Sequence, residues 1–275
     1  MIHTELNPQI QAVVVIPARY ASTRLPGKPL LEIGSKPMIV HVVERALGAR
    51  NVSRAIVATD DKRIFAVVAD AGYEAVMTSA EHQCGSDRLA EVALQLNDVE
   101  LLVNVQGDEP LISSLTIERV VDELLARPDA GMVSVYEPMP SVDDVLNPDV
   151  VKVVVDGSNR AIYFSRSPIP YPREAVRRNG DLKSALKNEP ELLATFRKHT
   201  GIYGYRRSVL LEFKGWPASR LEKSESLEQL RALEHGVSLF MVEAAGPSLG
   251  VDTIEDLQKV KDLFPGLEVS RLNEV

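Results

Sequence analysis

The sequence has almost no cysteine: Cys84 is the single one in 275 residues, so no disulfide can form within the chain. This usage is typical of proteins in a reducing compartment. Positive charge is also scarce, because 39 acidic residues outnumber 31 basic ones and give a net charge of −8. Nucleic-acid binding as the main activity is therefore disfavoured, since a phosphate backbone is bound by a basic face.

Long apolar segments are missing as well. No apolar run approaches the ~20 residues of a membrane-spanning helix. The first residues, MIHTELNPQIQ, have no basic segment followed by an apolar one, as a signal peptide would. Apolar residues make up 45% of the chain and charged ones 25%, which is ordinary for a soluble globular protein with a sizeable core. We therefore expect a cytoplasmic enzyme.

Two common phosphate-binding patterns are absent from the stretch VVVIPARYASTRLPGKPLL, residues 13–31. A Walker A loop would need a glycine where Ser22 stands and a hydroxyl residue where Pro29 stands. A dinucleotide fingerprint would need three spaced glycines, whereas this loop contains only Gly27. A Walker-type nucleotidase and an NAD-dependent oxidoreductase are thus both disfavoured.

What the stretch does contain is a loop of small residues with three cations. It begins with apolar residues 12–16, typical of a buried strand of a parallel sheet, which Pro17 is expected to end. The cations Arg19, Arg24 and Lys28 follow. Because ligands bind at the carboxyl ends of strands in open α/β sheets, the loop is predicted to hold a triphosphate by side-chain charge. The alternative is a solvated basic loop, which fits less well with an otherwise acidic surface.

Strand-like runs alternate with helical patterns through the first half of the chain. This alternation predicts an α/β fold with a Rossmann-like, mostly parallel sheet flanked by helices. Asp156-Gly157 suits a turn between strands 150–155 and 161–165, so an antiparallel hairpin makes the sheet mixed or begins a second lobe. The polar segment 174–190 is expected to be a mobile surface loop, and 219–234 a single helix.

The apolar run 101–105 is predicted to deliver Asp108 to the carboxyl end of a central strand, and Gly107 permits close backbone approach there. A carboxylate that faces a triphosphate is repelled unless a divalent cation lies between them. Mg²⁺, held by one or two carboxylates, phosphate oxygens and water, is the natural choice. The alternative is an aspartate that only stabilises a tight turn.

Two further candidates remain ambiguous from the residues alone. Ser86 suits the N-cap of a helix that runs to Leu96, and a helix N-terminus together with Arg88 suits a phosphate or a base edge. A plain capped helix accounts for the same residues equally well. Arg166, after a predicted strand, is either a solvated flank or a clamp for a carboxylate.

These motifs resemble those of the sugar nucleotidyltransferases. The loop PARYASTRLPGKPL (17–30) is similar to their nucleotide-binding loop, and VNVQGDEP (103–110) matches the 3-deoxy-manno-octulosonate cytidylyltransferase family (CMP-KDO synthetases) without a break. Further motifs of that family are resembled, in the same order, by HQCGSDRLAE (82–91), YFSR (163–166), HTGIYGY (199–205), LEQLR (227–231) and GVDTIEDL (250–257). The likeness runs from about residue 13 to about residue 263.

The resemblance implies that CMP is transferred from CTP to the anomeric hydroxyl of 3-deoxy-D-manno-octulosonate (KDO), with release of pyrophosphate, to make CMP-KDO for lipopolysaccharide biosynthesis. It also implies Mg²⁺ as cofactor and a homodimer. A single nucleotidyltransferase domain is expected over residues 1–275. Within it, 12–135 would bind mainly the nucleotide, 150–245 would form a smaller antiparallel lobe for sugar-acid binding and dimerisation, and 246–275 would return to the nucleotide-binding core.

The resemblance also assigns roles to single residues. The implied catalytic residues are Arg19, Lys28, Asp108 and Asp252, of which Asp108 and Asp252 would bind the metal. The implied CTP contacts are Arg19, Ser22, Arg24, Lys28, Ser86, Arg88 and Gln106. The implied sugar-acid contacts are Gln106, Arg166, His199, Tyr203, Glu228 and Gln229.

Other functions stay open at this point. A synthetase for N-acetylneuraminate would share the first loop but should lack the residue patterns at 106–110 and 227–231. An enzyme for 8-amino-KDO would have almost the same motifs as an enzyme for KDO. Residues 222–226 depart from the family pattern and could alter which sugar acid fits. A non-catalytic nucleotide-binding regulator is the alternative of another class, and the presence of both Asp108 and Asp252 argues against it.

Overall fold

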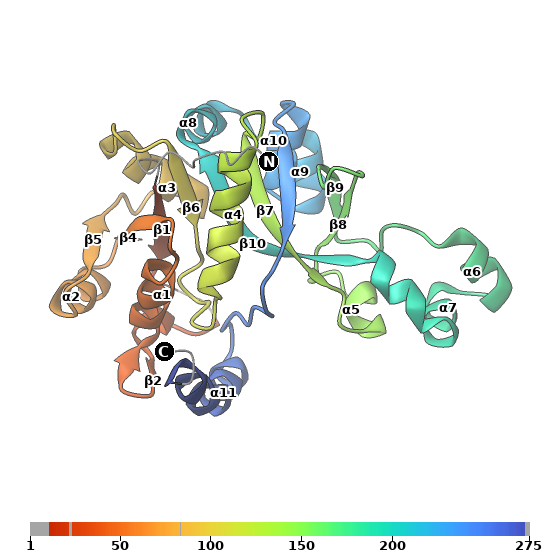
Figure 1. The fold of residues 1–275 in the computed structure, drawn as a ribbon, viewed down its shortest axis with the longest axis horizontal. Coiled ribbons are helices and arrows are strands. Elements are labelled where there is room, and N and C mark those ends of the chain that lie inside the picture. Colours follow the sequence, from red (N-terminus) through yellow and green to blue (C-terminus); the bar gives the residue numbers. More distant parts are fainter. Residues whose placement is uncertain (1–10, 22–23, 83, 273–275) are drawn as a thin grey trace, which may run out of the picture.

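The computed structural model describes residues 11–21, 24–82 and 84–272, with side chains up to Phe264. In this part of the chain nine strands form one sheet, and two short strands form a separate ribbon (Figure 1). The strands are β1 (Ala12–Ala18), β2 (Glu32–Ile33), β3 (Lys36–Pro37), β4 (Val52–Thr59), β5 (Glu74–Met77), β6 (Leu101–Asn104), β7 (Met132–Pro138), β8 (Lys152–Val155), β9 (Ala161–Ser165), β10 (Arg197–Arg206) and β11 (Leu239–Glu243).

The sheet is mixed and mostly parallel. Its order is β11-β7-β10-β6-β1-β4-β5, and the hairpin β8-β9 branches off β10. β1 pairs in parallel with both β4 and β6, whereas β10 runs antiparallel to β6 and β7. The predicted fold class, a Rossmann-like mixed sheet with a smaller antiparallel part, is confirmed, and the 156–157 turn does join an antiparallel hairpin.

Helices cover both faces of the sheet. They are α1 (Met38–Leu47), α2 (Lys62–Asp70), α3 (Gly85–Gln95), α4 (Ser114–Ala126), α5 (Val142–Leu146), α6 (Arg173–Asn179), α7 (Leu182–Asn188), α8 (Arg207–Gly215), α9 (Arg220–Glu225), α10 (Gln229–Glu234) and α11 (Ile254–Leu272), with 3₁₀ turns η1 (Lys28–Leu30) and η2 (Pro190–Thr195). Among the helices of the described residues, none combines the length and apolarity needed to cross a bilayer.

The apolar run of β1 is continuous because both of its faces are buried. Val14 and Ile16 point into the core beneath α1 and α4, whereas Val13 and Val15 point into the opposite core beneath α3 and α8 (Figure 1). The sequence predicted that the strand ends at Pro17, but the strand continues through Ala18 beside β4. On the β6 side, β1 has no ladder partner beyond Val15. The N–H that Pro17 lacks is therefore not needed on that side, and the pairing with β4 stays intact.

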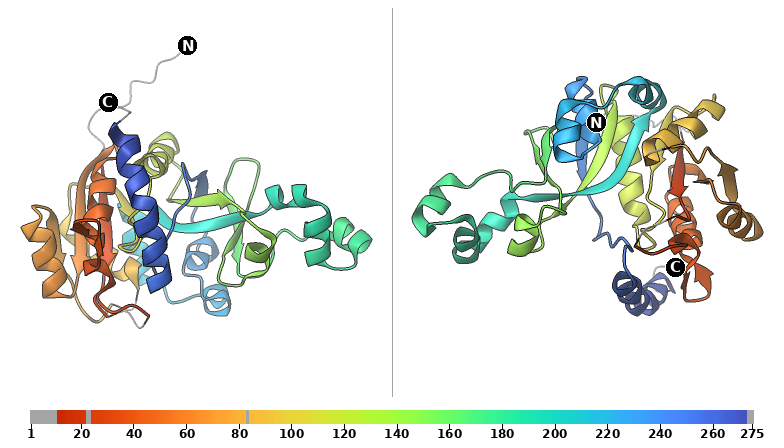
Figure 2. Two further views of the ribbon diagram at one scale, coloured as in Figure 1. Left: turned by 90° about the horizontal axis from the view of Figure 1, so that it is seen from below. Right: turned by 180° about the vertical axis from the view of Figure 1, so that it is seen from behind.

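The expected mobile loop at 174–190 is instead the helix pair α6–α7, at the end of an arm that projects from the sheet (Figure 2). Gly180, with φ of +90°, turns the chain between the helices, and Asp181 caps α7. The segment has few apolar residues, but Leu186 packs with Phe196 and Val145 into a small core of its own. The loop prediction was wrong because these core partners lie outside the segment.

The single helix expected at 219–234 is also two helices, α9 and α10. Ser226 adopts the left-handed conformation, with φ of +53°, and interrupts the helix between them. Leu227, directly after the break, is buried in the core beneath the sheet. Tertiary packing thus overrides a sequence with good helix propensity.

The segment between β11 and α11 crosses the carboxyl end of the sheet (Figure 1). The Ser248 hydroxyl donates to Glu109 Oε2 (2.7 Å), and the Ser248 N–H donates to Glu137 Oε1 (3.2 Å). The Val251 N–H donates to the backbone oxygen of Asp108 (2.9 Å). These bonds hold the chain just before α11 against the loop that follows β6 and against the end of β7.

Candidate active site

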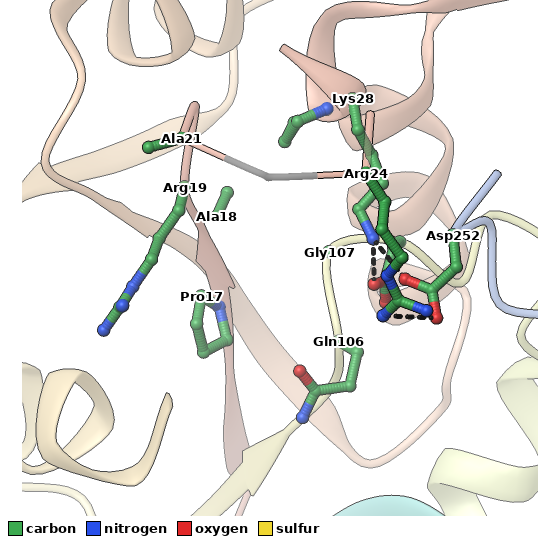
Figure 3. Close-up of a pocket in the computed structure, with 11 residues that line it drawn as sticks. Pro17, Ala18, Arg19, Ala21, Arg24, Lys28, Gln106, Gly107 and Asp252 are labelled. Carbon is green, nitrogen blue, oxygen red and sulfur yellow. Dashed lines mark hydrogen bonds and ion pairs between the residues drawn. The ribbon is translucent and has the colours of Figure 1, made fainter. Parts of the chain in front are cut away.

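A cleft opens where β1 and β6 end, and the segment just before α11 closes one side of it with Asp252 (Figure 3). Its volume of about 390 Å³ is in the range of small-molecule sites. The lining residues are Pro17, Ala18, Arg19, Ala21, Arg24, Lys28, Pro29, Gln106, Gly107, Asp108 and Asp252. The cation loop and the Asp108 loop, predicted separately, therefore line one site.

Gly107 allows the two loops to approach closely. A Cβ atom at this position would lie 2.9 Å from the backbone oxygen of Pro17 and 3.3 Å from the Ile39 side chain. The first distance is too short for any side chain, so glycine is required for this approach. The neighbouring Asp108 is thereby placed beside the β1 loop.

Lys28 is the centre of the charges in the cleft. Its Nζ donates to Asp108 Oδ2 at 2.6 Å and to Asp252 Oδ1 at 3.1 Å. Burial alone would lower the pKa of Lys28, but the charges and hydrogen bonds of the two aspartates outweigh it and raise the pKa. The ammonium therefore stays charged and joins two carboxylates that are 144 residues apart in the sequence, from 108 to 252.

The two arginines of the loop lie on different sides of the cleft. Arg24 Nη2 forms an ion pair with Asp252 Oδ2 at 3.0 Å, and its side chain is 65% exposed. Arg19 extends away from this group and donates to the backbone oxygen of His82 (Figure 3). The structure thus brings Arg24, Lys28 and both aspartates together, and leaves Arg19 at the opposite wall. Ser22, a predicted CTP contact, lies outside the described residues.

The donor set fits a magnesium ion. Asp108 and Asp252 offer hard carboxylate oxygens that converge within hydrogen-bond reach of one ammonium. Within the described ranges there is no cluster of three or more His, Cys, Asp or Glu side chains that could hold a metal unaided. Mg²⁺ suits such a site because it takes one or two carboxylates and completes its octahedron with water and substrate phosphates.

Ser86 does not cap α3. The helix begins at Gly85 with Cys84 at the N-cap, so Ser86 lies in the first turn, where its hydroxyl donates to Glu228 Oε2 at 2.8 Å. Cys84 Sγ lies 3.2 Å from Glu228 Oε1, and burial, together with the Glu228 charge, raises the pKa of Cys84 to about 12. The thiol therefore stays protonated. A predicted CTP contact and a predicted sugar contact thus touch each other; the CTP contact of Ser86 stays a prediction.

Arg88 is fully buried rather than open to the cleft. Its guanidinium donates to Thr78 Oγ1 and pairs with Asp60 Oδ2 at 2.9 Å. The pair connects α3 to the chain after β4 and β5. Its direct contact with CTP stays a prediction.

The predicted sugar contacts continue along β10 from the cleft. Gln106 Nε2 donates to the Gly201 oxygen at 3.3 Å. On the same strand, the rings of His199 and Tyr203 pack against each other with their centroids 5.4 Å apart. His199 Nε2 lies 2.9 Å from Ser134 Oγ. Burial lowers the pKa of His199 to about 3, so its ring is neutral and suits hydrogen bonding to a neutral hydroxyl.

Two side chains at the α9–α10 boundary complete this region. Gln229 is buried, and among the described residues its Nε2 has no hydrogen-bond partner. A buried donor of this kind is costly unless a ligand oxygen accepts from it. Glu228, which precedes it, has a pKa raised by burial. Arg166 faces the same boundary, where its Nε donates to the backbone oxygen of Glu225 at 2.7 Å.

Sequence reasoning missed the contact that supports the cation loop. The Arg63 guanidinium lies 3.3 Å above the ring centroid of Tyr20, and Gly27, with φ of +70°, packs against the same ring. Asp61, the N-cap of α2, pairs with Arg63 at 2.6 Å and orients it. The sequence feature that could have indicated this contact is Tyr20, an aromatic residue in a loop of small ones.

The chain is similar to known cytidylyltransferases over most of its length. The profile of a family described as Cytidylyltransferase matches residues 13–240. The 3-deoxy-manno-octulosonate cytidylyltransferase of Trichlorobacter lovleyi is 49% identical over 253 residues, which are 92% of this chain and 98% of that protein. The protein of the same name from Geobacter sulfurreducens is 48% identical over 90% of this chain and 96% of that protein.

Two solved structures are similar to the fold. A CMP:2-keto-3-deoxy-manno-octonic acid synthetase complexed with CTP is 43% identical, with a TM-score of 0.81 over 93% of this chain and 99% of that chain. A cytidylyltransferase from Leptospira borgpetersenii is 17% identical, with a TM-score of 0.61 over 96% of this chain and 95% of that chain. The second of these supports the fold alone.

Proposed function

The chain belongs to the cytidylyltransferase family, within the 3-deoxy-manno-octulosonate cytidylyltransferases, and from this premise we propose that it transfers CMP from CTP to the anomeric hydroxyl of KDO and releases pyrophosphate. One observation carries the proposal for this chain: Lys28, Asp108 and Asp252 meet in one cleft at the carboxyl ends of β1 and β6. The relatives named for this reaction match nearly the whole chain.

The mechanism follows from charge and position. Arg24 and Lys28 face the cleft and would neutralise the triphosphate, while Arg19 lines its other wall. The anomeric hydroxyl attacks the α-phosphorus in line, the bond to the β-phosphate oxygen breaks, and pyrophosphate leaves; the hydroxyl proton is lost to solvent or a base. No covalent enzyme intermediate is needed, so alignment of the two substrates and stabilisation of the phosphoryl charge supply the rate.

We include Mg²⁺ in the proposal, held by Asp108 and Asp252. When bound, it would polarise the phosphoryl oxygens as a Lewis acid. Lys28 would then shift its hydrogen bonds from the carboxylates toward phosphate oxygens. This assignment gives the two aspartates, which would otherwise repel the substrate, a reason to line a triphosphate site.

We also propose that the chain acts as a homodimer in the cytoplasm. The dimer rests on the resemblance, and the compartment on a single cysteine in a chain with no disulfide. Light scattering on the purified protein should give twice the 30.2 kDa chain mass. A mass equal to one chain at micromolar concentration would overturn the dimer.

The test of the activity is pyrophosphate release from CTP and Mg²⁺ in parallel reactions with KDO, 8-amino-KDO and N-acetylneuraminate. We expect release with KDO, and none without a sugar acid or after chelation of the metal. A preference for 8-amino-KDO or N-acetylneuraminate would keep the reaction and change the substrate. Binding of CTP without release in any arm would favour a nucleotide-binding regulator.

A further inference from the structure

Glu225, the last residue of α9, binds the end of β9 through its side chain. Its Oε1 accepts from Ser165 Oγ at 2.7 Å and from Tyr163 OH at 3.4 Å, and its Oε2 accepts from the Arg166 N–H at 2.9 Å. Burial alone would raise the pKa of Glu225, but these hydrogen bonds outweigh it and lower the pKa. One carboxylate thus receives two donors from β9 and one from the residue after it, all about 60 residues earlier in the chain.

Arg166 returns the contact. Its Nε donates to the Glu225 backbone oxygen at 2.7 Å, and its Nη2 lies 3.4 Å from the Ser226 oxygen. The side chain of each residue therefore binds the backbone of the other, which fixes the relative orientation of the two residues as well as their distance. A third bond, from Nη1 to the Pro148 oxygen at 3.0 Å, holds the guanidinium in place.

The Arg166 backbone is itself anchored from the other side. Its carbonyl accepts from Lys152 Nζ at 2.7 Å. Lys152 is fully buried and donates its two remaining protons to the oxygens of Asn147 and Val150, at 2.8 Å and 2.6 Å. All three acceptors of Lys152 are backbone oxygens, so the end of β9 forms a rigid platform for α9.

This platform sets the start of the predicted sugar-binding helix. Ser226, directly after Glu225, takes the left-handed conformation, and Glu228 and Gln229 follow within three residues of it. A rotation at Ser226 would move Glu228 away from Ser86 and would change the direction of the neighbouring Gln229 side chain. The contacts of Glu225 and Arg166 oppose this rotation because they hold the carbonyls on both sides of the bend.

We propose that Glu225 is a positioning residue for sugar-acid binding, which fixes the α9–α10 bend on the end of β9 and so places Glu228 and Gln229 for the substrate. This inference rests on the proposed function. Glu225 does not line the cleft that holds the cations and aspartates, so we expect its loss to act more strongly on the sugar acid than on CTP. The same linkage makes Arg166 part of the platform.

The test is the kinetic behaviour of Glu225→Gln. The amide has the same shape, but one accepting oxygen becomes a donor that faces the donors of β9. We expect the KM for KDO to rise roughly tenfold, in line with the loss of one or two buried hydrogen bonds. The KM for CTP should stay within about twofold, and kcat at saturating KDO should change less than the KM for KDO.

The matched control is Glu212→Gln, the same chemical change at an exposed position of α8. It should leave the KM for KDO unaltered. Ser165→Ala is the second variant, because it removes one donor to Glu225 from the opposite side and keeps the carboxylate. It should raise the KM for KDO in the same direction, by a smaller factor, even if Glu225→Gln fails to fold.

The outcomes separate the two proposals. If the unaltered chain uses KDO but neither Glu225→Gln nor Ser165→Ala changes its KM for KDO, the positioning role is wrong and the proposed function stands. An equal rise in the KM values for KDO and CTP would also overturn it, since a general loss of structure acts on both. If the unaltered chain does not use KDO, the proposed function fails, and this inference fails with it.

Discussion

Lys28 holds together two carboxylates that would otherwise repel each other. Its Nζ is 2.6 Å from Asp108 and 3.1 Å from Asp252, and its own side chain is only 12% exposed. The same carboxylates would bind Mg²⁺ when a triphosphate arrives, and Lys28 would then face phosphate. A single residue can serve both states because the lysine stem is flexible and its ammonium bonds in any direction.

Asp108→Asn tests the metal assignment at this scale. The amide keeps the shape but loses the charge, so we expect turnover to fall by at least about 10²-fold. The Asp108 side chain is 30% exposed and on the protein surface of the cleft, so the free energy of unfolding should change by no more than about 1 kcal/mol. Pyrophosphate release and urea unfolding measure the two effects. Asp98→Asn, an exposed change of the same kind, is the control; near-normal turnover of Asp108→Asn would remove the metal role.

His199 gives a prediction about pH. Burial lowers its pKa from 6.5 to about 3, so the unfolded chain takes up a proton below pH 6.5 that the folded chain refuses until about pH 3. This residue therefore reduces stability as the pH falls through that window, and adds nothing above it. We expect the imidazole NMR signals of His199, assigned with a His199→Gln variant, to stay constant between about pH 5 and pH 8. A titration midpoint inside that range would contradict the neutral ring.

At the scale of elements, helices are placed by partners as much as by their own sequence. α1 and α4 were predictable because their apolar spacing matches the core that they cover. α6 and α7 were not, since each is seven residues long and their core includes Phe196 and Val145 from other elements. The break at Ser226 has the same origin: the left-handed residue is held by contacts with β9.

Gly180→Ala tests whether α6 and α7 are set by their connection. Gly180 has φ of +90° and no atom within 4 Å of an added Cβ, so the substitution adds backbone strain without a clash. We expect a cost of about 1–2 kcal/mol, seen as roughly 5–30-fold faster hydrogen exchange in α7. Gly157→Ala, also in open space but without the positive φ, should leave exchange in α7 unaltered. Unchanged hydrogen exchange in Gly180→Ala would mean that a different backbone conformation at residue 180 can also connect α6 and α7.

At the scale of the whole molecule, the site joins distant parts of the chain. The β1 loop, the β6 loop and the start of α11 meet because β1 and β6 are parallel neighbours and the Val251–Asp108 bond returns the C-terminal part to the sheet. A ligand that binds all three segments therefore binds the folded chain and not the unfolded one. Its binding energy adds to the stability of the whole sheet.

CTP with Mg²⁺ should accordingly raise the melting temperature. At a CTP concentration about 100 times its Kd, the stabilisation is about 2.7 kcal/mol, which corresponds to roughly 5–10 °C for a chain of this size. Thermal unfolding with and without CTP, followed by fluorescence or calorimetry, measures the shift. Lys28→Met should lose most of it, whereas Lys62→Met, at an exposed position, should keep it. An equal shift in both variants would remove Lys28 from the nucleotide site.

The sequence by itself determined the fold class, the cation loop and the place of Asp108 after a buried strand, because each depends on residues that are adjacent in the chain; Asp252 was predicted from the resemblance to the family. Strand periodicity and a cluster of charges are local signals, and they do not need a partner to be recognised. Tertiary structure alone decided that Pro17 stays in β1, that Ser86 meets Glu228 across 142 residues, and that Arg166 binds the backbone at Glu225. Burial and packing supply those outcomes, and both depend on distant parts of the chain that local patterns do not encode.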